Sequence, residues 1–451
     1  MQSKHDSPAE STMNRRDLLT TTGKLAAGAV AGAALVQSGV PTVFARRASS
    51  VTTLNFLTGL AGSDGAAMQA IVTAFNKANP DINVKMQIIG TWAQFYTKLL
   101  PTLTAGNAPE VFTTHIQEML YFQDKQLFLQ LDDLFGPSLP ESDFAPTPMK
   151  YAAYKGHMYG MPLDMHGWAF YTNPTLLKKA GLPLRAPADG AELVDWARKL
   201  TIDKNGNNGK SARFDPSHVV QYGIATSWDA PPTFLSTLWS FGGNTISADG
   251  KTAQFNTPAM RDAVNFWGDL IFKYHACNKP AGYGANGAWG AYQNNALAMV
   301  PDGNWMRSWF AAHPKVARKA NFMPKYGKTQ QAWMSGHVIA APASLPNEKK
   351  PAVYKFMHWL SNHGVQWTET AGHIPARVSQ RTSSKVMSLW PQQVYGPELA
   401  AIGHIEQPST VFFDVQDAYV AEIDAAWNGT KSVSAALASA QSRVQRALSG
   451  Q

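Results

Sequence analysis

Tryptophans in predicted loops are the side chains of this sequence best suited to hold a polar ligand. The chain has 14 tryptophans, and an indole can cover the C–H face of a sugar ring while neighbouring polar groups bind its hydroxyls. Five lie near glycine, proline or asparagine outside helical patterns, and each could contact a ligand or be buried: Trp92, Trp228, Trp289, Trp305 and Trp333. Five others have helical spacing and are expected in the core: Trp196, Trp267, Trp359, Trp367 and Trp427. Trp305 is the strongest ligand candidate, because it follows a short apolar strand and Gly303 lets the backbone approach a cleft.

Polar residues at predicted strand ends and turns could bind the hydroxyl groups of such a ligand. The candidates are Asp64, His115, Asp164, His166 and Asn304. A carboxylate accepts strong hydrogen bonds, so Asp164 is expected to bind hydroxyls. The alternatives are a hinge salt bridge or helix cap for Asp164, a surface loop for His115 and an N-cap for Asp64.

Several other kinds of chemistry lack the residues that they need. Cys277 is the only cysteine, which excludes a disulfide framework and any multi-thiolate metal site. A pattern resembling a calcium loop is broken by Asn208 and Phe214, where glycine and glutamate are required. His358 and His363 are five residues apart and lack the spacing of a zinc protease motif. We therefore expect no cofactor, no metal and no catalytic residue.

The charges are dispersed along the chain. It has 39 Lys and Arg against 31 Asp and Glu, a formal net charge of +8, and no basic tract of five or six residues. We therefore expect no nucleic-acid partner. The length of 451 residues exceeds what one compact core usually serves, which predicts two lobes.

The amino-terminal segment has the pattern of an export signal. Arg15 and Arg16 precede an apolar run at 25–36, and Ala45 offers a small residue for cleavage. Paired arginines are typical of a twin-arginine signal peptide, and the run is too short to span a bilayer. We expect residues 1–45 to be removed, leaving a soluble monomer in the periplasm or outside the cell.

From Val51 onward, strand and helix patterns alternate. A short apolar strand around Leu54 and Phe56 precedes a helical face at 67–75, and 82–88 alternates as a strand. This order predicts parallel βαβ units, whose ligands bind beyond the carboxyl ends of the strands. The loops expected to line one wall of a ligand site are 59–64, 90–92 and 113–115.

The order of several motifs resembles one known family. The run AMQAIVTAFNKANPDINVKMQII and the following WAQFYTKLLPTLTAGNAPEVFTTH resemble the first lobe of the family 1 extracellular solute-binding proteins. This group contains the maltose- and glycerol-phosphate-binding proteins. Later motifs keep the family order over nearly all of residues 51–450: GHMYGMP at 156–162, FYTN at 170–173, ALAMVPDGNW at 296–305, SGH at 335–337 and GHIPAR at 372–377.

The resemblance implies an α/β fold of the two-lobed type II periplasmic-binding-protein kind, with a multi-crossover hinge. Its first lobe would comprise 46–163 plus 320–366, and its second lobe 164–319 plus 367–451. It also implies the function of an ABC importer's substrate-binding protein, which captures a small hydrophilic solute, a sugar by preference, and delivers it to a membrane permease without catalysis. Gly336 and Arg377 join the ligand-binding candidates because they lie in family motifs.

Two alternatives for the function remain open at this point. One is a receptor for an anionic solute such as a glycerol phosphate, which would need an arginine or a helix amino terminus aimed at it. Arg307 and Arg377 are the candidate arginines, and each could equally be a structural ion-pair partner. The other is an exported glycoside hydrolase, because such enzymes also use aromatic platforms and a pair of carboxylates.

Overall fold

The computed structural model describes residues 51–226, 230–283, 287–390 and 392–450, so the predicted signal segment and Trp228 lie outside the described residues. Helices and strands alternate within these ranges and form an α/β fold with two main sheets. Among the described helices, none has the length and apolar character needed to cross a membrane.

The first sheet has five strands in the order β2-β1-β3-β13-β6. Strand β1 pairs in parallel with β2 and β3, and helices α1 and α2 supply the two crossovers, which confirms the predicted βαβ units. Strand β13 pairs antiparallel with both β3 and β6. The elements are β1 (Thr52–Thr58), α1 (Gly62–Ala78), β2 (Ile82–Ile88), α2 (Trp92–Thr104), β3 (Val111–His115), β6 (Met161–Pro162) and β13 (His337–Ala340).

The second sheet has eight strands and is organised around β7 (Asp164–Thr172), in which all nine residues are buried. Strands β10, β11, β12 and β14 all pair antiparallel with β7. The other strands are β8 (Ile202–Asp203), β9 (Val219–Ile224), β10 (Leu297–Gly303), β11 (Lys319–Asn321), β12 (Ala332–Ser335), β14 (Ile374–Pro375) and β15 (Gly403–His404); β4 (Ala153–Tyr154) and β5 (His157–Met158) form a separate hairpin.

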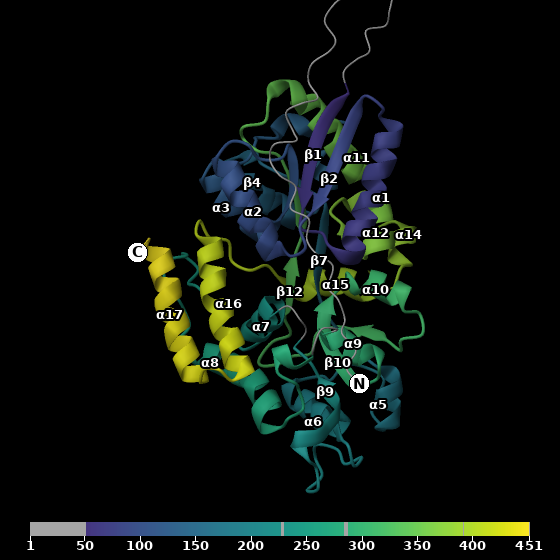
Figure 1. The fold of residues 1–451 in the computed structure, drawn as a ribbon, viewed down its shortest axis with the longest axis vertical. Helices are drawn as coiled ribbons and strands as arrows, with labels where there is room; N and C mark the ends of the chain where they lie inside the picture. The colour runs from purple at the N-terminus through teal and green to yellow at the C-terminus, as the bar shows by residue number, and fades with distance from the viewer. Residues whose placement is uncertain (1–50, 227–229, 284–286, 391, 451) are drawn as a thin grey trace, which may run out of the picture. The chain divides into compact units, whose positions relative to one another are not determined.

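Helices cover both sheets and enclose the cores (Figure 1). Four of the five tryptophans expected in the core, Trp196, Trp267, Trp367 and Trp427, are buried, and Trp359 packs half-buried against Phe75. The helices are α3 (Met119–Asp124), α4 (Pro146–Ala152), α5 (Pro174–Lys179), α6 (Gly190–Leu200), α7 (Ala230–Ser240), α8 (Pro258–Gly268), α9 (Gly287–Gln293), α10 (Met306–Ala312), α11 (Lys350–Asn362), α12 (Gly364–Ala371), α13 (Val378–Arg381), α14 (Ser384–Met387), α15 (Gln392–Ile402), α16 (Phe412–Asn428) and α17 (Val433–Ser449). The last two run side by side and pack on α8, so they join the second sheet's core as expected.

The chain passes between the two sheets at more than one point. It leaves the first sheet after β6 and enters β7 at Asp164, and it returns between β12 and β13, where Gly336 separates the strands. It leaves again after α12, which packs on α1, and enters β14. The segment 320–335, assigned by resemblance to the first lobe, includes β12, which pairs with β7 of the second sheet.

Gly336 lies where two backbones approach closely. A Cβ at this position would lie 2.4 Å from the backbone oxygen of Asp164 and 3.1 Å from Met165 Sδ. We expect Gly336→Ala to lower the free energy of unfolding by about 1–3 kcal/mol, because the added methyl overpacks this contact. Urea unfolding measures the change. Gly136→Ala is the control, since nothing lies within 4 Å of a Cβ there, and equal midpoints for the two variants would contradict the prediction.

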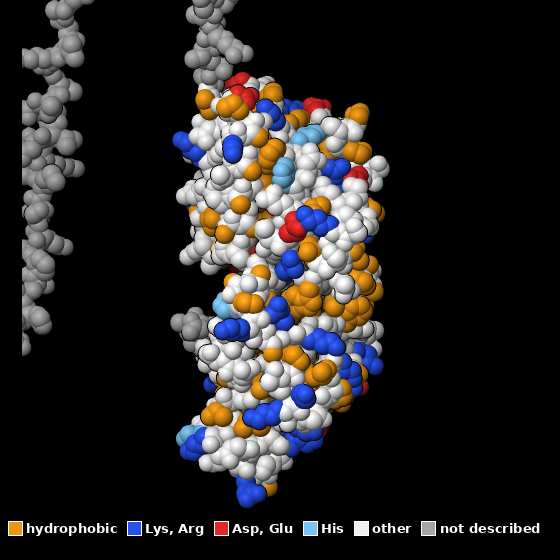
Figure 2. Space-filling model, turned by 90° about the vertical axis from the view of Figure 1, so that its right-hand side faces the viewer, with side chains coloured by type: hydrophobic (Ala, Val, Ile, Leu, Met, Phe, Trp, Pro, Cys, Tyr) orange, Lys and Arg blue, Asp and Glu red, His pale blue; other side chains and the backbone are white. Residues whose placement is uncertain are grey.

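On the face shown in Figure 2, most Lys and Arg side chains lie on the lower half, where uncharged and hydrophobic side chains separate them.

Candidate functional site

A pocket of about 570 Å³ lies where the loops after β1, β2 and β3 face β7, β12 and β13. All three loops expected to line a ligand site contribute to it. Their lining residues are Gly59, Leu60, Ala61, Gly62, Ser63, Asp64, Gly90, Thr91, Trp92, Ala93, His115, Gln117 and Glu118. The other lining residues are His166, Pro231, Pro232, Trp305, Trp333, His337, His373, Glu406 and Gln416. A smaller hollow of about 500 Å³ beside Lys98 and Glu110 has no aromatic residue in its lining.

The structure brings six of the sequence-predicted residues to this pocket: Asp64, Trp92, His115, His166, Trp305 and Trp333. Asp64 does not cap its helix, because α1 begins earlier, with Ala61 at the N-cap position. Its Oδ2 atom instead accepts a hydrogen bond of 2.9 Å from His373 Nε2. The N-cap interpretation of Asp64 is therefore wrong.

Five predicted residues do not line the pocket. Trp289 lies in α9, not in a loop, and its Nε1 donates to Asp302 Oδ2 at 2.6 Å in the core. Asn304 is fully buried, and Arg377 forms an ion pair of 2.7 Å with Asp143. Asp164 and Gly336 lie directly behind the pocket wall, at the crossings between the sheets.

Two of the tryptophans lie flat against glycine backbone. A Cβ on Gly59 would lie 2.5 Å from the Trp92 ring, and a Cβ on Gly303 would lie 2.3 Å from the Trp305 ring. Trp92 also stacks on His337, with ring centroids 5.5 Å apart and an interplanar angle of 23°. Both indoles are half-buried and line the pocket. An indole in this position can offer its exposed atoms to the apolar C–H face of a sugar ring.

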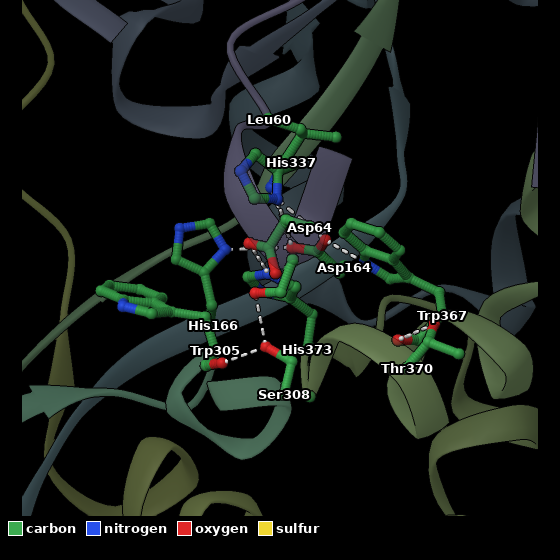
Figure 3. Close-up of polar contacts among 12 residues, drawn as sticks. Leu60, Asp64, Asp164, His166, Trp305, Ser308, His337, Trp367, Thr370 and His373 are labelled. Carbon is green, nitrogen blue, oxygen red and sulfur yellow. Dashed lines mark hydrogen bonds and ion pairs between the residues drawn. The ribbon is translucent and has the colours of Figure 1, made fainter. Parts of the chain in front are cut away.

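Asp164 organises the floor of the pocket (Figure 3). The carboxylate is fully buried and accepts hydrogen bonds from His166 Nδ1 at 3.0 Å, His337 Nδ1 at 2.9 Å and Trp367 Nε1 at 2.6 Å. The backbone N–H of His337 donates a fourth, at 3.1 Å. Burial opposes ionisation, but His337 and His373 hold the pKa of Asp164 well below its usual range. The carboxylate is therefore a fixed anion that orients two imidazoles.

Three histidines near this carboxylate have shifted pKa values, and the shifts do not all have the same direction. Burial, with His337 adding to it, lowers the pKa of His166 to about 3. Burial together with His337 and His166 also lowers the pKa of His115 well below its usual range. Burial disfavours the charged form of His373 too, yet Asp164 and Asp64 raise its pKa overall. Near neutral pH the pocket therefore holds neutral imidazoles at His115 and His166, each able to donate or accept a hydrogen bond.

Two buried carboxyl groups complete the pocket wall. Glu406 accepts hydrogen bonds from Tyr419 Oη at 2.6 Å and Gln416 Nε2 at 2.9 Å, and burial raises its pKa to about 7. Burial also raises the pKa of Glu118 well above its usual range, and the charge of Glu406 adds to the effect. A protonated carboxyl group can donate one hydrogen bond and accept others, so both groups suit uncharged hydroxyls.

Stability is expected to fall by about 2 kcal/mol between about pH 5.5 and pH 8 through Glu406 alone. Its folded-state pKa of about 7 lies above the ordinary value of 4.5, so the unfolded chain releases this proton first and rising pH favours unfolding. Glu406→Gln should reduce this dependence on pH, because glutamine does not titrate. The variant should remain folded, because Gln416 can rotate its amide and keep a hydrogen bond to residue 406. Urea unfolding at a series of pH values tests this, with exposed Glu141→Gln as control. An unchanged slope in Glu406→Gln would contradict it.

Four titratable residues of the pocket could not be predicted from the sequence: Glu118, His337, His373 and Glu406. His337 and His373 both follow glycine in motifs of the family resemblance, SGH and GHIPAR, and that position was the available signal. Glu118 and Glu406 carry no local signal. Cys277 is buried as expected, and burial raises the pKa of its thiol to about 12.

The two arginines considered as contacts for an anionic ligand do not line the pocket. Arg307 donates to the backbone oxygens of Glu369 and Trp390, at 3.2 Å and 2.5 Å. Arg377 is held by Asp143 and by Asn362 Oδ1 at 2.7 Å. Neither arginine is among the residues that line the pocket.

The two sheets, their repeated crossings and the pocket between strand ends define an α/β receptor of the type II periplasmic-binding-protein class. This confirms the predicted fold class, and solved structures share the fold. An ABC transporter solute-binding protein from Thermotoga lettingae, bound to α-D-tagatose, matches with a TM-score of 0.76 and 21% identity, covering 88% of this chain and 100% of that one. The GacH receptor of Streptomyces glaucescens, solved unliganded and with acarbose, matches with a TM-score of 0.75 and 21% identity, covering 88% and 98%.

Residues 61–367 match the family described as bacterial extracellular solute-binding protein. The sn-glycerol-3-phosphate-binding periplasmic protein UgpB of Salmonella typhimurium is 22% identical over 427 residues, which cover 89% of this chain and 93% of the relative. The chain belongs to the bacterial extracellular solute-binding protein family, as the motif order predicted. It is a solute-binding protein.

Proposed function

We propose that this protein is the exported receptor of an ABC importer, and that it captures a neutral sugar in the pocket beside Asp164 and delivers it to a membrane permease unchanged. The observation that carries the proposal is the composition of the pocket. Among the residues that the structure describes, three tryptophans line it, Trp92, Trp305 and Trp333, and no Lys or Arg does.

This composition favours a neutral solute over a phosphate ester. Lys, Arg and helix N-termini are the usual partners of a phosphate. The N-terminal residues of α1 and α2 line the pocket, but no Lys or Arg is among its described lining residues, and Glu118 and Glu406 place carboxyl groups at the same wall. Solved structures with this fold hold tagatose and acarbose. The glycerol-3-phosphate protein is similar over most of its length, at 22% identity, so glycerol 3-phosphate is the competing ligand.

Binding without turnover fits the hydrogen bonds of the acidic residues at the pocket. Asp64 is engaged by His373, and Glu118 accepts from Tyr96 Oη and from the backbone N–H of His115. Burial raises the pKa of Glu118 well above its usual range and that of Glu406 to about 7, which favours the protonated forms that can hydrogen-bond to hydroxyls. These groups are proposed to hold the solute and not to cleave it.

We propose that two lobes close on the solute, and strand pairing supports revised boundaries for them. The first lobe comprises residues 51–163 together with 337–371, because β13 pairs in the first sheet and α12 packs on α1. The second lobe comprises 164–335 and 372–450, because β11, β12 and β14 pair with β7. Gly336 is then part of the hinge, and small-angle scattering should show a smaller radius of gyration when the solute is bound.

A thermal-shift screen followed by calorimetry tests the ligand. Monosaccharides, disaccharides, polyols and glycerol 3-phosphate are compared at equal concentration, because a ligand that binds only the folded state raises the melting temperature. At least one neutral sugar should stabilise the protein, and glycerol 3-phosphate should not. Stabilisation by glycerol 3-phosphate alone would establish the competing ligand, and release of shorter oligosaccharides at catalytic turnover would overturn the receptor function.

A further inference from the structure

Three histidines and one aspartate meet at the floor of the pocket (Figure 3). Asp164 and His166 lie at the start of β7, His337 at the start of β13, and His373 directly before β14. All four are buried, and one oxygen or nitrogen of each side chain lies within 4.8 Å of the corresponding atoms of the others. The crossings between the sheets therefore bring together four side chains from distant parts of the sequence.

Two of the distances between these donor atoms are close to those in a metal coordination shell. Asp164 Oδ1 lies 3.0 Å from His166 Nδ1 and 3.1 Å from His337 Nδ1, and all four donor atoms lie within 4.8 Å of one another. Ligands that bind zinc at about 2.0–2.1 Å in a tetrahedron lie about 3.3 Å apart. An ion could therefore take the place of the protons on His166 Nδ1 and His337 Nδ1. The distances from these two atoms to Asp164 would change by only a few tenths of an ångström.

His373 supplies an independent observation. Its Nδ1 is buried and has no hydrogen-bond partner, while its Nε2 is held by Asp64 at 2.9 Å. A carboxylate that fixes one ring nitrogen and leaves the other free is the arrangement found around metal-binding histidines. His373 also stacks on Trp367 at 5.0 Å with an interplanar angle of 9°, which fixes the plane of the ring. An unpaired buried nitrogen is unfavourable, and a bound ion would satisfy it.

We propose that Asp164, His166, His337 and His373 bind one divalent transition-metal ion of the zinc class. Three imidazole nitrogens and one carboxylate oxygen match the preferences of Zn²⁺, whereas Mg²⁺ and Ca²⁺ require mostly oxygen ligands. His166, His337 and His373 also line the pocket, so the ion would be reached through it. The sequence led us to expect no metal, and this proposal replaces that expectation. No local spacing in the sequence could reveal ligands that come from three separate segments of the chain.

Metal titration of the purified protein tests the proposal. The protein is prepared without a polyhistidine tag, stripped with a chelator and titrated with Zn²⁺ by calorimetry; Co²⁺ is added separately to record visible absorption. One Zn²⁺ per chain and the intense absorption of tetrahedral Co²⁺ are expected. His373→Ala should weaken Zn²⁺ binding by about 100-fold or more, and Asp64→Asn by about 10- to 100-fold, as for a residue that orients a ligand.

A second histidine–carboxylate pair supplies the matched control. His157 Nδ1 lies 2.8 Å from Asp132 Oδ2, with side chains 51% and 41% exposed. His157→Ala should leave Zn²⁺ affinity unchanged, and circular dichroism establishes that each variant is folded. If His373→Ala does not fold, the proposal is tested by the Zn²⁺ affinity of Asp64→Asn and by the Co²⁺ spectrum of the parent protein. Zn²⁺ affinity equal in the parent and Asp64→Asn, the weak spectrum of six-coordinate Co²⁺, or no stoichiometric uptake would each overturn the proposal.

The metal shares its pocket with the solute, so the two proposals are tested separately. The metal titration contains no sugar, and sugar binding is measured on chelator-treated protein. Sugar binding without metal uptake would overturn only the metal site. Stoichiometric metal uptake without sugar binding would overturn only the sugar receptor.

Discussion

Asp164→Ala is expected to lower the free energy of unfolding by about 3–5 kcal/mol, as for the loss of one partner from a buried charged network. Four donors now point at the carboxylate, from His166, His337 and Trp367. Without it, each is left buried with no acceptor, and every such group is unfavourable. Equilibrium unfolding in urea, monitored by tryptophan fluorescence, measures the loss.

The exposed pair of Asp132 and His157 provides the control for Asp164. Its side chains are about half exposed, so Asp132→Ala should change stability by at most about 1 kcal/mol. Asp164→Asn distinguishes the loss of charge from the loss of volume. Asparagine fills the same space as aspartate, but it is uncharged and has only one acceptor oxygen. A variant Asp164→Ala that unfolds at the same urea concentration as the parent would show that this cluster contributes little to the fold.

Trp305→Ala is expected to weaken solute binding by about 2–4 kcal/mol, or roughly 30- to 1,000-fold, as for a central aromatic contact in a binding site. The indole lines the pocket beside His166 and rests edge-on against Trp168 at 5.2 Å. Because the ring is half-buried, its removal should affect stability less than the about 3–5 kcal/mol typical of a core tryptophan. Calorimetry with the sugar found in the ligand screen gives the change in affinity.

Trp359 is the matched control for Trp305. It is also half-buried, but it packs on Phe75 and its Nε1 donates to the backbone oxygen of Ile71, away from the pocket. Trp359→Ala should reduce stability and leave affinity unchanged. Parent-like affinity in Trp305→Ala would remove Trp305 from the binding site, and a large loss of stability in that variant would assign it to the core.

Local patterns were enough to predict the elements that carry one wall of the pocket. The apolar face of α1 and the alternation in β2 depend on nearby residues, so their periods are visible in the sequence. The loops beyond the strand ends followed from the parallel order, and Asp64, Trp92 and His115 all line the pocket. The placement of Asp164 at the first crossing came from the resemblance to a family.

Tertiary packing decided the residues that could not be predicted. The glycines on either side of Trp289 predict a loop, but the residue lies in α9 and is buried against Asp302. Arg377 was assigned to the ligand, but Asp143 lies close enough to pair with it. His337 and His373 meet their neighbours in the pocket only when β13 pairs in the first sheet and β14 in the second. The sequence around a single histidine does not show which distant residues will contact it.

The pairing of β13 has a consequence for the order in which the chain can fold during synthesis. Strand β3 pairs with β1 on one side and with β13 on the other, and β13 begins more than 200 residues later in the sequence, at His337. All five residues of β3 are buried in the finished protein. While the ribosome makes the intervening residues, the open edge of β3 can pair with other chains, as unpaired strand edges do. This edge is therefore a site where nascent molecules are exposed to aggregation and to chaperones.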